Sequence, residues 1–307
     1  MYNGRHMRLG LCCTFREEQI SFKSRQATYL KKFPEKERLS LISTTVLHNA
    51  TALMQALEFC EENSIGSFRI NSKFLPLKAH PELGYRLEEL PDILLISELL
   101  DTARLFRHTR NIRLTFHPDQ FILLSSPRDD VTESSIADLE YHAELAELLG
   151  ADVITIHGGG AYGDPVSSLA RLEKNADRLS QSVRERITLE NDDRVYTPEQ
   201  LLSTCSKLSI PLVYDVHHHR CLKDSLSIDE ATAAARTTWD REPLFHLSSP
   251  KDGWAARDTK KHHDYIDAGD VPAAWQGFEV TVEVEAKAKE LAVRQLRYDL
   301  IEKRNAA

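Results

Sequence analysis

The chain has 307 residues with no run of about 18 apolar residues and no apolar N-terminal segment, so we expect a cytosolic protein without a membrane span. Its formal net charge of −8 argues against a protein that coats nucleic acid nonspecifically, although it leaves a nuclease open. Five cysteines, an odd number without a CxxC pair, predict neither a disulfide framework nor a cysteine metal site.

Short apolar runs recur along the whole chain, and each ends in a polar or ionisable residue. Segments with helical apolar spacing separate most of them, and this alternation predicts a (β/α)8 TIM barrel, which places the carboxyl ends of all its strands on one face. The eight expected strands are 7–12, 67–71, 112–118, 152–157, 187–192, 211–218, 244–249 and 279–287.

The predicted helices carry clear end signals. Apolar residues recur at three- and four-residue spacing over 136–149, and Gly150 follows as a C-terminal cap. The segments 197–200 and 227–230 read as capping boxes, in which a hydroxyl precedes Gln or Glu by three residues. Strand and helix therefore alternate along nearly the whole chain.

The length fits one barrel domain over the whole chain, since a minimal barrel needs roughly 250 residues. We expect insertions at 13–35 and 72–91 and a C-terminal helix over 288–307. Residues 1–6 suggest a leader or a tag remnant, with Met7 as an alternative start.

Potential metal ligands stand at the ends of the last six expected strands. Together imidazole and carboxylate suit Zn²⁺ or Mn²⁺, whereas Ca²⁺ and Mg²⁺ prefer oxygen shells. A lone histidine at a strand end is more often structural, but seven ligands at one end of consecutive strands favour a metal centre able to hydrolyse a phosphodiester. The seven are His117, His157, Glu190, Asp215, His218, His246 and Glu285.

A series of short strings resembles the UV damage endonuclease family, metal-dependent (β/α)8 nucleases related in design to endonuclease IV. The resemblance covers about residues 7 to 290. Its strings are RLG (8–10), FRIN (68–71), AHP (79–81), FHPDQF (116–121), HGGGAYGD (157–164), LEND (189–192), DVHHH (215–219), HLSSP (246–250), HHDYID (262–267) and VEAKAKE (284–290).

The resemblance implies two or three divalent ions per chain, expected to be Mn²⁺ with Zn²⁺ as the alternative. His117 and His157 would hold one ion, and Glu190 would bridge it to a second. The shell of the second ion would be completed by Asp215, His246 and Glu285. Five of these residues are the expected catalytic set: Glu190, His117, His157, Asp215 and Glu285.

A third ion would be held by His218 and His263. We prefer His263 to His262 because it directly precedes the DYI string. We expect His217 and His219 to face away from His218, because adjacent strand residues point to opposite faces. Asn191 and Asp192 are expected to orient the ligands.

Lesion recognition is assigned by the resemblance to Gln120 and Phe121, the pair that family members insert into the duplex. The alternative for Phe121 is a buried loop anchor. His80 matches a position at the edge of the site that contacts phosphate, and an ordinary loop histidine is the alternative. The implied partner is damaged double-stranded DNA, and we expect a monomer without an obligate protein partner or a membrane.

The implied activity is hydrolysis of the phosphodiester immediately 5′ of a UV photoproduct, with abasic sites as further substrates. Two departures from the family pattern concern the third ion and the lesion contacts: Leu244 stands where some members have lysine, and residues 11–15 lack the family's Tyr and Asn. A sugar isomerase or epimerase of the same barrel class, and a non-catalytic protein that binds DNA damage, are the alternatives.

Overall fold

The computed structural model describes residues 7–306, so the interpretation of residues 1–6 lies outside the described residues. Eight parallel strands close into a barrel in the order β1 to β8, and β1 pairs with β8. The expected (β/α)8 barrel is therefore confirmed. The strands are β1 Met7–Cys12, β2 Ser67–Ile70, β3 Arg113–Phe116, β4 Val153–His157, β5 Ile187–Glu190, β6 Leu212–Asp215, β7 Leu244–Leu247 and β8 Val280–Val284.

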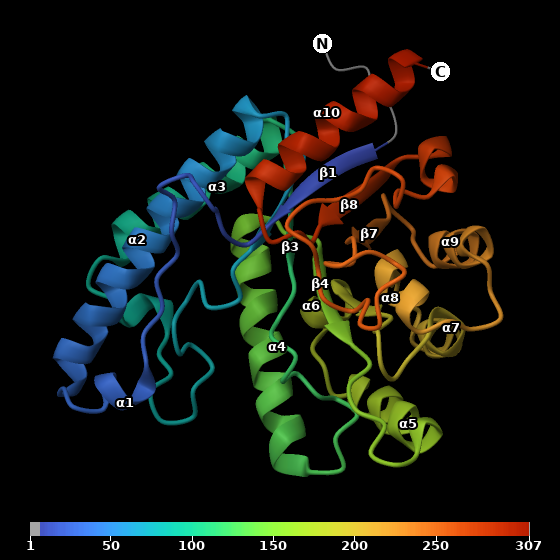
Figure 1. Ribbon diagram of the computed structural model, residues 1–307. Coiled ribbons are helices and arrows are strands. Elements are labelled where there is room, and N and C mark those ends of the chain that lie inside the picture. Colours follow the sequence, from blue (N-terminus) through green and yellow to red (C-terminus); the bar gives the residue numbers. More distant parts are fainter. Residues whose placement is uncertain (1–6, 307) are drawn as a thin grey trace.

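Helices surround the barrel, with α2 and α3 on one side and α7 and α9 on the other (Figure 1). The last helix, α10, lies alongside β1. The α-helices are α1 Ala27–Leu30, α2 Glu35–Glu62, α3 Ile93–Thr109, α4 Asp129–Leu149, α5 Pro165–Ala176, α6 Gln181–Arg184, α7 Pro198–Leu208, α8 Val216–Cys221, α9 Ile228–Thr237 and α10 Glu290–Ala306, and the 3₁₀ helices are η1 Leu87–Glu89 and η2 Ala273–Gly277.

The predicted helix ends are confirmed. Gly150 follows α4 in the left-handed region with φ 72°, a conformation that costs glycine little. Thr197 and Ser227 begin α7 and α9 as capping boxes with Gln200 and Glu230. Local sequence therefore sets these boundaries directly.

The expected strand over 211–218 changes to a helix before its end. The run 211–218 was expected to be extended throughout, but the strand ends at Asp215 and α8 begins at Val216. The Asp215 side chain caps this helix by accepting a hydrogen bond of 2.7 Å from the backbone N–H of His218. His217 to His219 thus lie on a helix, where neighbours point about 100° apart instead of to opposite faces.

The barrel interior is polar beneath the strand ends, and a small apolar cluster lies below. Thr155 and Thr188 share a hydroxyl hydrogen bond of 3.1 Å between β4 and β5. Leu244 is fully buried and forms a small apolar cluster with Val153, Val213 and Trp239. The barrel is thus a packed core, and the space for ligands lies at its carboxyl end.

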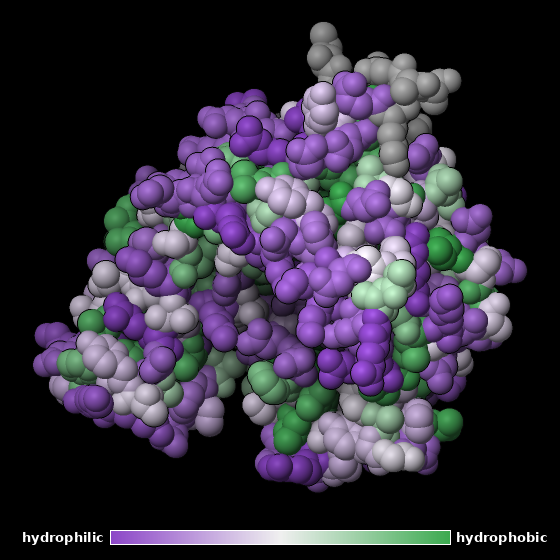
Figure 2. All heavy atoms as spheres, viewed as in Figure 1, coloured by the Kyte–Doolittle hydropathy of each residue, from purple (hydrophilic) through white to green (hydrophobic). Residues whose placement is uncertain are grey.

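On the outer surface, the face in Figure 2 is mostly hydrophilic, and its apolar residues form small separate patches. Within residues 7–306, none of the helices combines the length and apolar character needed to cross a membrane.

Candidate metal centre

Strand ends bring the predicted ligands together. His157 is the last residue of β4 and pairs in register with Glu190, the last residue of β5. Asp215, which ends β6, pairs in the same way with His246 on β7. His117 follows β3 directly, and Glu285 follows β8. Residues about 170 positions apart thus meet at one end of the barrel.

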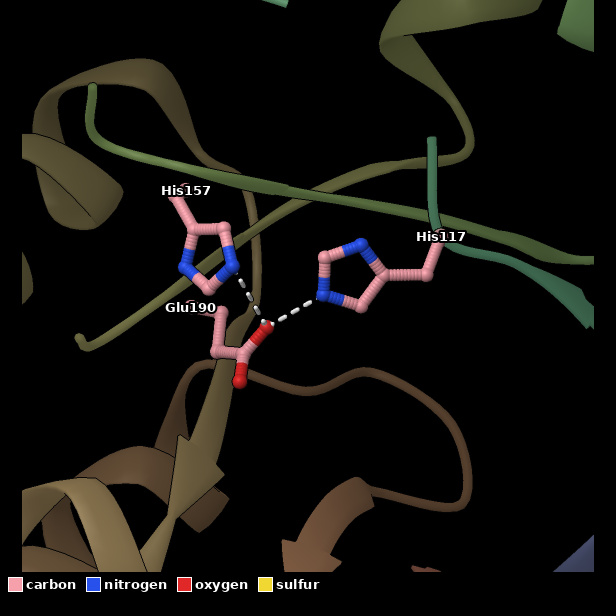
Figure 3. Close-up of side chains that lie close together, drawn as sticks. All are labelled: His117, His157 and Glu190. Atoms are coloured by element: carbon pink, nitrogen blue, oxygen red, sulfur yellow. Dashed lines mark hydrogen bonds and ion pairs between the residues drawn. The ribbon is translucent and has the colours of Figure 1, made fainter. Parts of the chain in front are cut away.

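Glu190 lies at the middle of this cluster and is fully buried. Its Oε2 atom is 2.6 Å from Nε2 of His117 and 3.8 Å from Nε2 of His157 (Figure 3). Its Oε1 atom is 2.9 Å from Nδ1 of His246 and 3.4 Å from Nδ1 of His218. Each oxygen therefore faces a different pair of imidazoles, as a carboxylate that bridges two ions would.

Ligand atoms in three groups of side chains lie close enough together to hold an ion each. In each group the atoms are within 4.8 Å of one another; His117 belongs to the first and second of the groups given below, and Glu190 to the first and third. The three groups are His117 with His157 and Glu190, His117 with His246 and Glu285, and Glu190 with Asp215 and His218.

Buried atoms without a hydrogen-bond partner fit a metal centre. Asp215 is fully buried, and its Oδ2 atom has no hydrogen-bond partner among the described residues. A buried carboxylate oxygen without a partner is costly, and a cation would satisfy it. The mixture of imidazole and carboxylate donors suits Mn²⁺ or Zn²⁺.

The cluster is electrostatically coupled. Burial alone would raise the pKa of the Glu190 carboxyl, but the surrounding imidazoles, His246 foremost, lower it well below its usual range. Burial lowers the pKa of His246, yet the carboxylate of Glu190 raises it to about 10. Burial lowers the pKa of His157, which favours the neutral form that binds metals. Without metal, the cluster therefore holds protons that an ion must displace.

His218 reaches the centre from α8. Its Nδ1 atom lies 2.9 Å from the backbone oxygen of Asn191 and 3.5 Å from Oδ2 of Asp215. His219 points elsewhere, between the hydroxyl of Tyr214 at 2.7 Å and the carboxylate of Asp224 at 2.9 Å. His219 is therefore directed away from His218 by helical geometry, whereas the ring centroid of His217 lies 6.2 Å from that of His218.

Asn191 and Asp192 have different roles. The side chain of Asn191 bonds both the backbone N–H and the backbone oxygen of Asp215 at 2.9 Å, which fixes the end of β6. Asp192 instead accepts from the backbone N–H groups of Arg194, Val195 and Tyr196 and shapes its own loop. Among the hydrogen bonds of the described residues, Asp192 thus has none to a ligand side chain.

His263 is not brought to the cluster. It is exposed, and its Nδ1 atom accepts a hydrogen bond of 2.9 Å from the backbone N–H of Tyr265. Its neighbour His262 is partly buried, with Nδ1 3.9 Å from Glu285 and its ring centroid 6.2 Å from that of His218. The preference for His263 is therefore corrected: the backbone turn at Tyr265 uses its ring nitrogen, and His262 faces the site.

The recognition residues lie on a loop beyond His117. Gln120 is exposed, and the Phe121 side chain is 72% exposed, so Phe121 is not the buried anchor that we considered as its alternative. His80 uses Nδ1 to accept from the backbone N–H groups of Glu82 and Leu83, at 3.1 and 3.2 Å. This contact gives His80 a structural role in its loop.

The structure places both positions at which this chain departs from the family pattern. Leu244 lies two residues before His246 on the same face of β7 and packs into the apolar cluster below, so it offers no ligand. Phe15 packs against Phe59 and Phe68, with ring centroids 5.3 and 6.0 Å away, and is not presented to solvent as a stacking residue.

Sequence reasoning missed Arg69 and Glu283. Arg69 is 7% exposed, and its Nη1 atom is 2.7 Å from Oε1 of the candidate ligand Glu285. Glu283 is 1% exposed and lies 3.2 Å from Nε2 of His246. An arginine in FRIN and a glutamate in TVEVE, both inside predicted strands, were the available signal, because a charged residue buried in a strand needs a partner.

The fold and the site together define a (β/α)8 barrel protein with a candidate metal centre at the carboxyl ends of its strands. Residues 7–306 match the model of the family described as UV-endonuclease UvdE, and the chain belongs to this family.

Curated relatives support this membership. The UV DNA damage endonuclease of Bacillus velezensis is 32% identical over 89% of this chain and 87% of its own length. The protein of the same name from Nostoc sp. is 33% identical over 94% of this chain and 89% of its own length. The UV-damage endonuclease of Neurospora crassa is 34% identical over 90% of this chain but 45% of its own length.

Solved structures agree on the fold. The crystal structure of SacUVDE superposes with a TM-score of 0.84 at 28% identity and covers 97% of this chain and 99% of its own. Endonuclease IV from Thermus thermophilus gives 0.62 at 16% identity, with 96% and 99% covered. A D-psicose 3-epimerase from Clostridium cellulolyticum gives 0.58 at 13% identity, with 96% and 97% covered. For these last two structures, the low identity shows a shared fold alone.

Proposed function

We propose that the protein is a metal-dependent endonuclease that cleaves damaged double-stranded DNA immediately 5′ of UV photoproducts and also at abasic sites. The observation that carries the proposal is the meeting of His117, His157 and Glu190 at the strand ends of a chain that matches the UV-endonuclease family over residues 7–306. The protein would act as a single barrel domain and a monomer.

The chain's own side chains would bind two or three divalent ions. His117 and His157 would hold one ion, and Glu190 would share its second oxygen with a neighbouring ion beside His246 and Glu285. The group of Glu190, Asp215 and His218 offers a further position, to which His262 is close. Bound divalent ions would lower the pKa of a water molecule and stabilise the leaving oxygen of the phosphodiester. We expect Mn²⁺, with Zn²⁺ as the alternative.

DNA would approach over the carboxyl face of the barrel. The loops after β1 and β7 rim this face and carry exposed basic residues, among them Lys23, Lys251 and Lys261. Such cations would neutralise phosphates on either side of the acidic centre. The exposed pair Gln120 and Phe121 would enter the duplex at the lesion, where stacking is already weakened and extrusion costs less.

A nicking assay tests the proposal. The protein is treated with chelator, dialysed and supplied with Mn²⁺, and it is then incubated with end-labelled duplexes that carry one photoproduct, one abasic site or no damage. We expect a single nick directly 5′ of the lesion, with a 3′-hydroxyl that a ligase accepts. We also expect no nick with chelator present. Protein that contains metal but nicks neither damaged duplex would refute the proposed function.

A further inference from the structure

A buried carboxylate that is not among the proposed ligands lies directly beneath the centre. Glu283 lies on β8 and precedes Glu285, which directly follows the strand, by two residues, so both side chains point into the barrel. Its Oε2 atom accepts a hydrogen bond of 2.5 Å from Nε of Arg69, and its Oε1 atom accepts from the hydroxyl of Thr115. Both oxygens of Glu283 are therefore already bound by protein donors, and neither is free for an ion.

The two ring nitrogens of His246 face different partners. Nδ1 lies 2.9 Å from Oε1 of Glu190, toward the proposed metal positions. Nε2 lies 3.2 Å from Oε2 of Glu283 and 2.9 Å from Nη2 of Arg69. A guanidinium can only donate hydrogen bonds, and a carboxylate can only accept them. A protonated Nε2 therefore donates to Glu283, whereas an unprotonated Nε2 accepts from Arg69.

We propose that Glu283 is a positioning residue of the metal centre: it accepts the Nε2–H of His246 and thereby directs the Nδ1 lone pair of that histidine to the ion. A neutral imidazole that gives Nδ1 to a metal carries its proton on Nε2, and Glu283 is the acceptor within reach of that proton. Without metal, Nδ1 can also carry a proton and donate to Glu190 at 2.9 Å, so the two carboxylates accommodate the ring with and without metal.

Arg69 fixes this carboxylate in place. Its guanidinium bonds Glu283 through Nε and Nη2 and contacts Oε1 of Glu285 at 2.7 Å through Nη1. Both of these arginine nitrogens contact Oε2 of Glu283, while the hydroxyl of Thr115 donates to Oε1, so the two residues together determine the direction of both Glu283 oxygens. Arg69, Glu283 and His246 all lie inside the barrel and are at least nine-tenths buried, so no water replaces a lost contact easily. The inference rests on the proposed metal centre.

The test compares Glu283→Gln with Glu242→Gln. The first substitution keeps the size of the side chain but removes the charge that holds the His246 proton. The second removes a carboxylate that pairs in the same way with Arg8, at 3.0 Å, and accepts from Thr281, outside the candidate metal groups. Zn²⁺ affinity is measured by competition with a chromophoric chelator. We expect Glu283→Gln to bind Zn²⁺ roughly 10- to 100-fold more weakly than the wild type, and Glu242→Gln to bind it normally.

A spectroscopic readout keeps the inference falsifiable if the variant does not fold. In wild-type protein loaded with Zn²⁺, nitrogen-15 NMR of the histidine rings should show His246 with metal on Nδ1 and a slowly exchanging proton on Nε2. Metal on Nε2, or a folded Glu283→Gln variant with wild-type Zn²⁺ affinity, would overturn the positioning role. A wild-type protein that binds no Zn²⁺ or Mn²⁺ would instead refute the proposed metal centre.

Discussion

Replacing Glu190 by Gln tests the centre most directly. The change preserves volume, but an amide offers one oxygen acceptor and one NH₂ group where the carboxylate offers two oxygens. In the structure each oxygen faces its own pair of imidazoles, at 2.6 and 3.8 Å on one side and 2.9 and 3.4 Å on the other. Glu190→Gln can therefore serve at most one of the two positions.

The size of the effect follows from that loss. Removing one electrostatic contact to the reacting charges typically costs 10²- to 10³-fold in rate, so we expect incision of irradiated duplex to fall at least about 100-fold, or roughly 2.7 kcal/mol in the activation barrier. Asp215→Asn and Glu285→Gln should act in the same direction. The exposed residue Glu185, which precedes the same strand, gives the control Glu185→Gln with normal incision expected.

The assay is single-turnover nicking at saturating Mn²⁺, combined with metal content by mass spectrometry and circular dichroism to confirm folding. Glu190→Gln should retain fewer ions per chain than the wild type. If this variant were folded and nicked damaged DNA at the wild-type rate, Glu190 would not bridge two ions, and the reasoning from its four imidazole neighbours would be refuted.

Three further predictions concern recognition, the third position and stability. The double variant Gln120→Ala with Phe121→Ala should leave metal content unchanged but weaken binding to damaged duplex by roughly 5- to 150-fold at fixed salt. In gel-shift titrations the loss should be smaller when the lesion lies opposite a gap, and equal losses on both substrates would indicate a misfolded loop. His262→Ala should lower metal content and His263→Ala should not, and the reverse result would restore the expectation from sequence. Burial lowers the pKa of His142 from 6.5 to about 4, so the unfolded state binds more protons than the folded state between these pH values. As the pH falls through this window, the wild type should therefore lose about 3 kcal/mol of unfolding free energy relative to His142→Leu. Urea denaturation of both proteins at several pH values checks this, and a constant difference would contradict it.

The pattern of apolar runs predicts the barrel and the strand-end positions of most of the candidate ligands. Parallel strands that end in His117, His157, Glu190 and Asp215 necessarily place these residues on one face, because every crossover in a (β/α)8 barrel returns the chain in the same direction. The capping boxes and Gly150 are equally local, since each depends on a few neighbouring residues and the backbone groups beside them.

Tertiary structure decided where local patterns were ambiguous. The run ending at His218 has the composition of a strand, but Asp215 caps a helix there, and this choice depends on the packing of α8 against the barrel. His262 and His263 are adjacent and chemically identical, so only the path of the β7–β8 loop selects which one faces Glu285. Local sequence cannot encode that selection.

The buried pair of Arg69 and Glu283 is the clearest case. Each is a charged residue within an apolar strand, separated from the other by 214 positions, and neither has a local partner that would explain it. Barrel closure brings them together beneath His246, because β2 and β8 flank β1 and point alternate residues into the same interior. The sequence therefore determines which residues stand at the strand ends. Only the closed barrel determines that Arg69 and Glu283 pair beneath those residues, because the two charges meet only once the strands enclose a common interior.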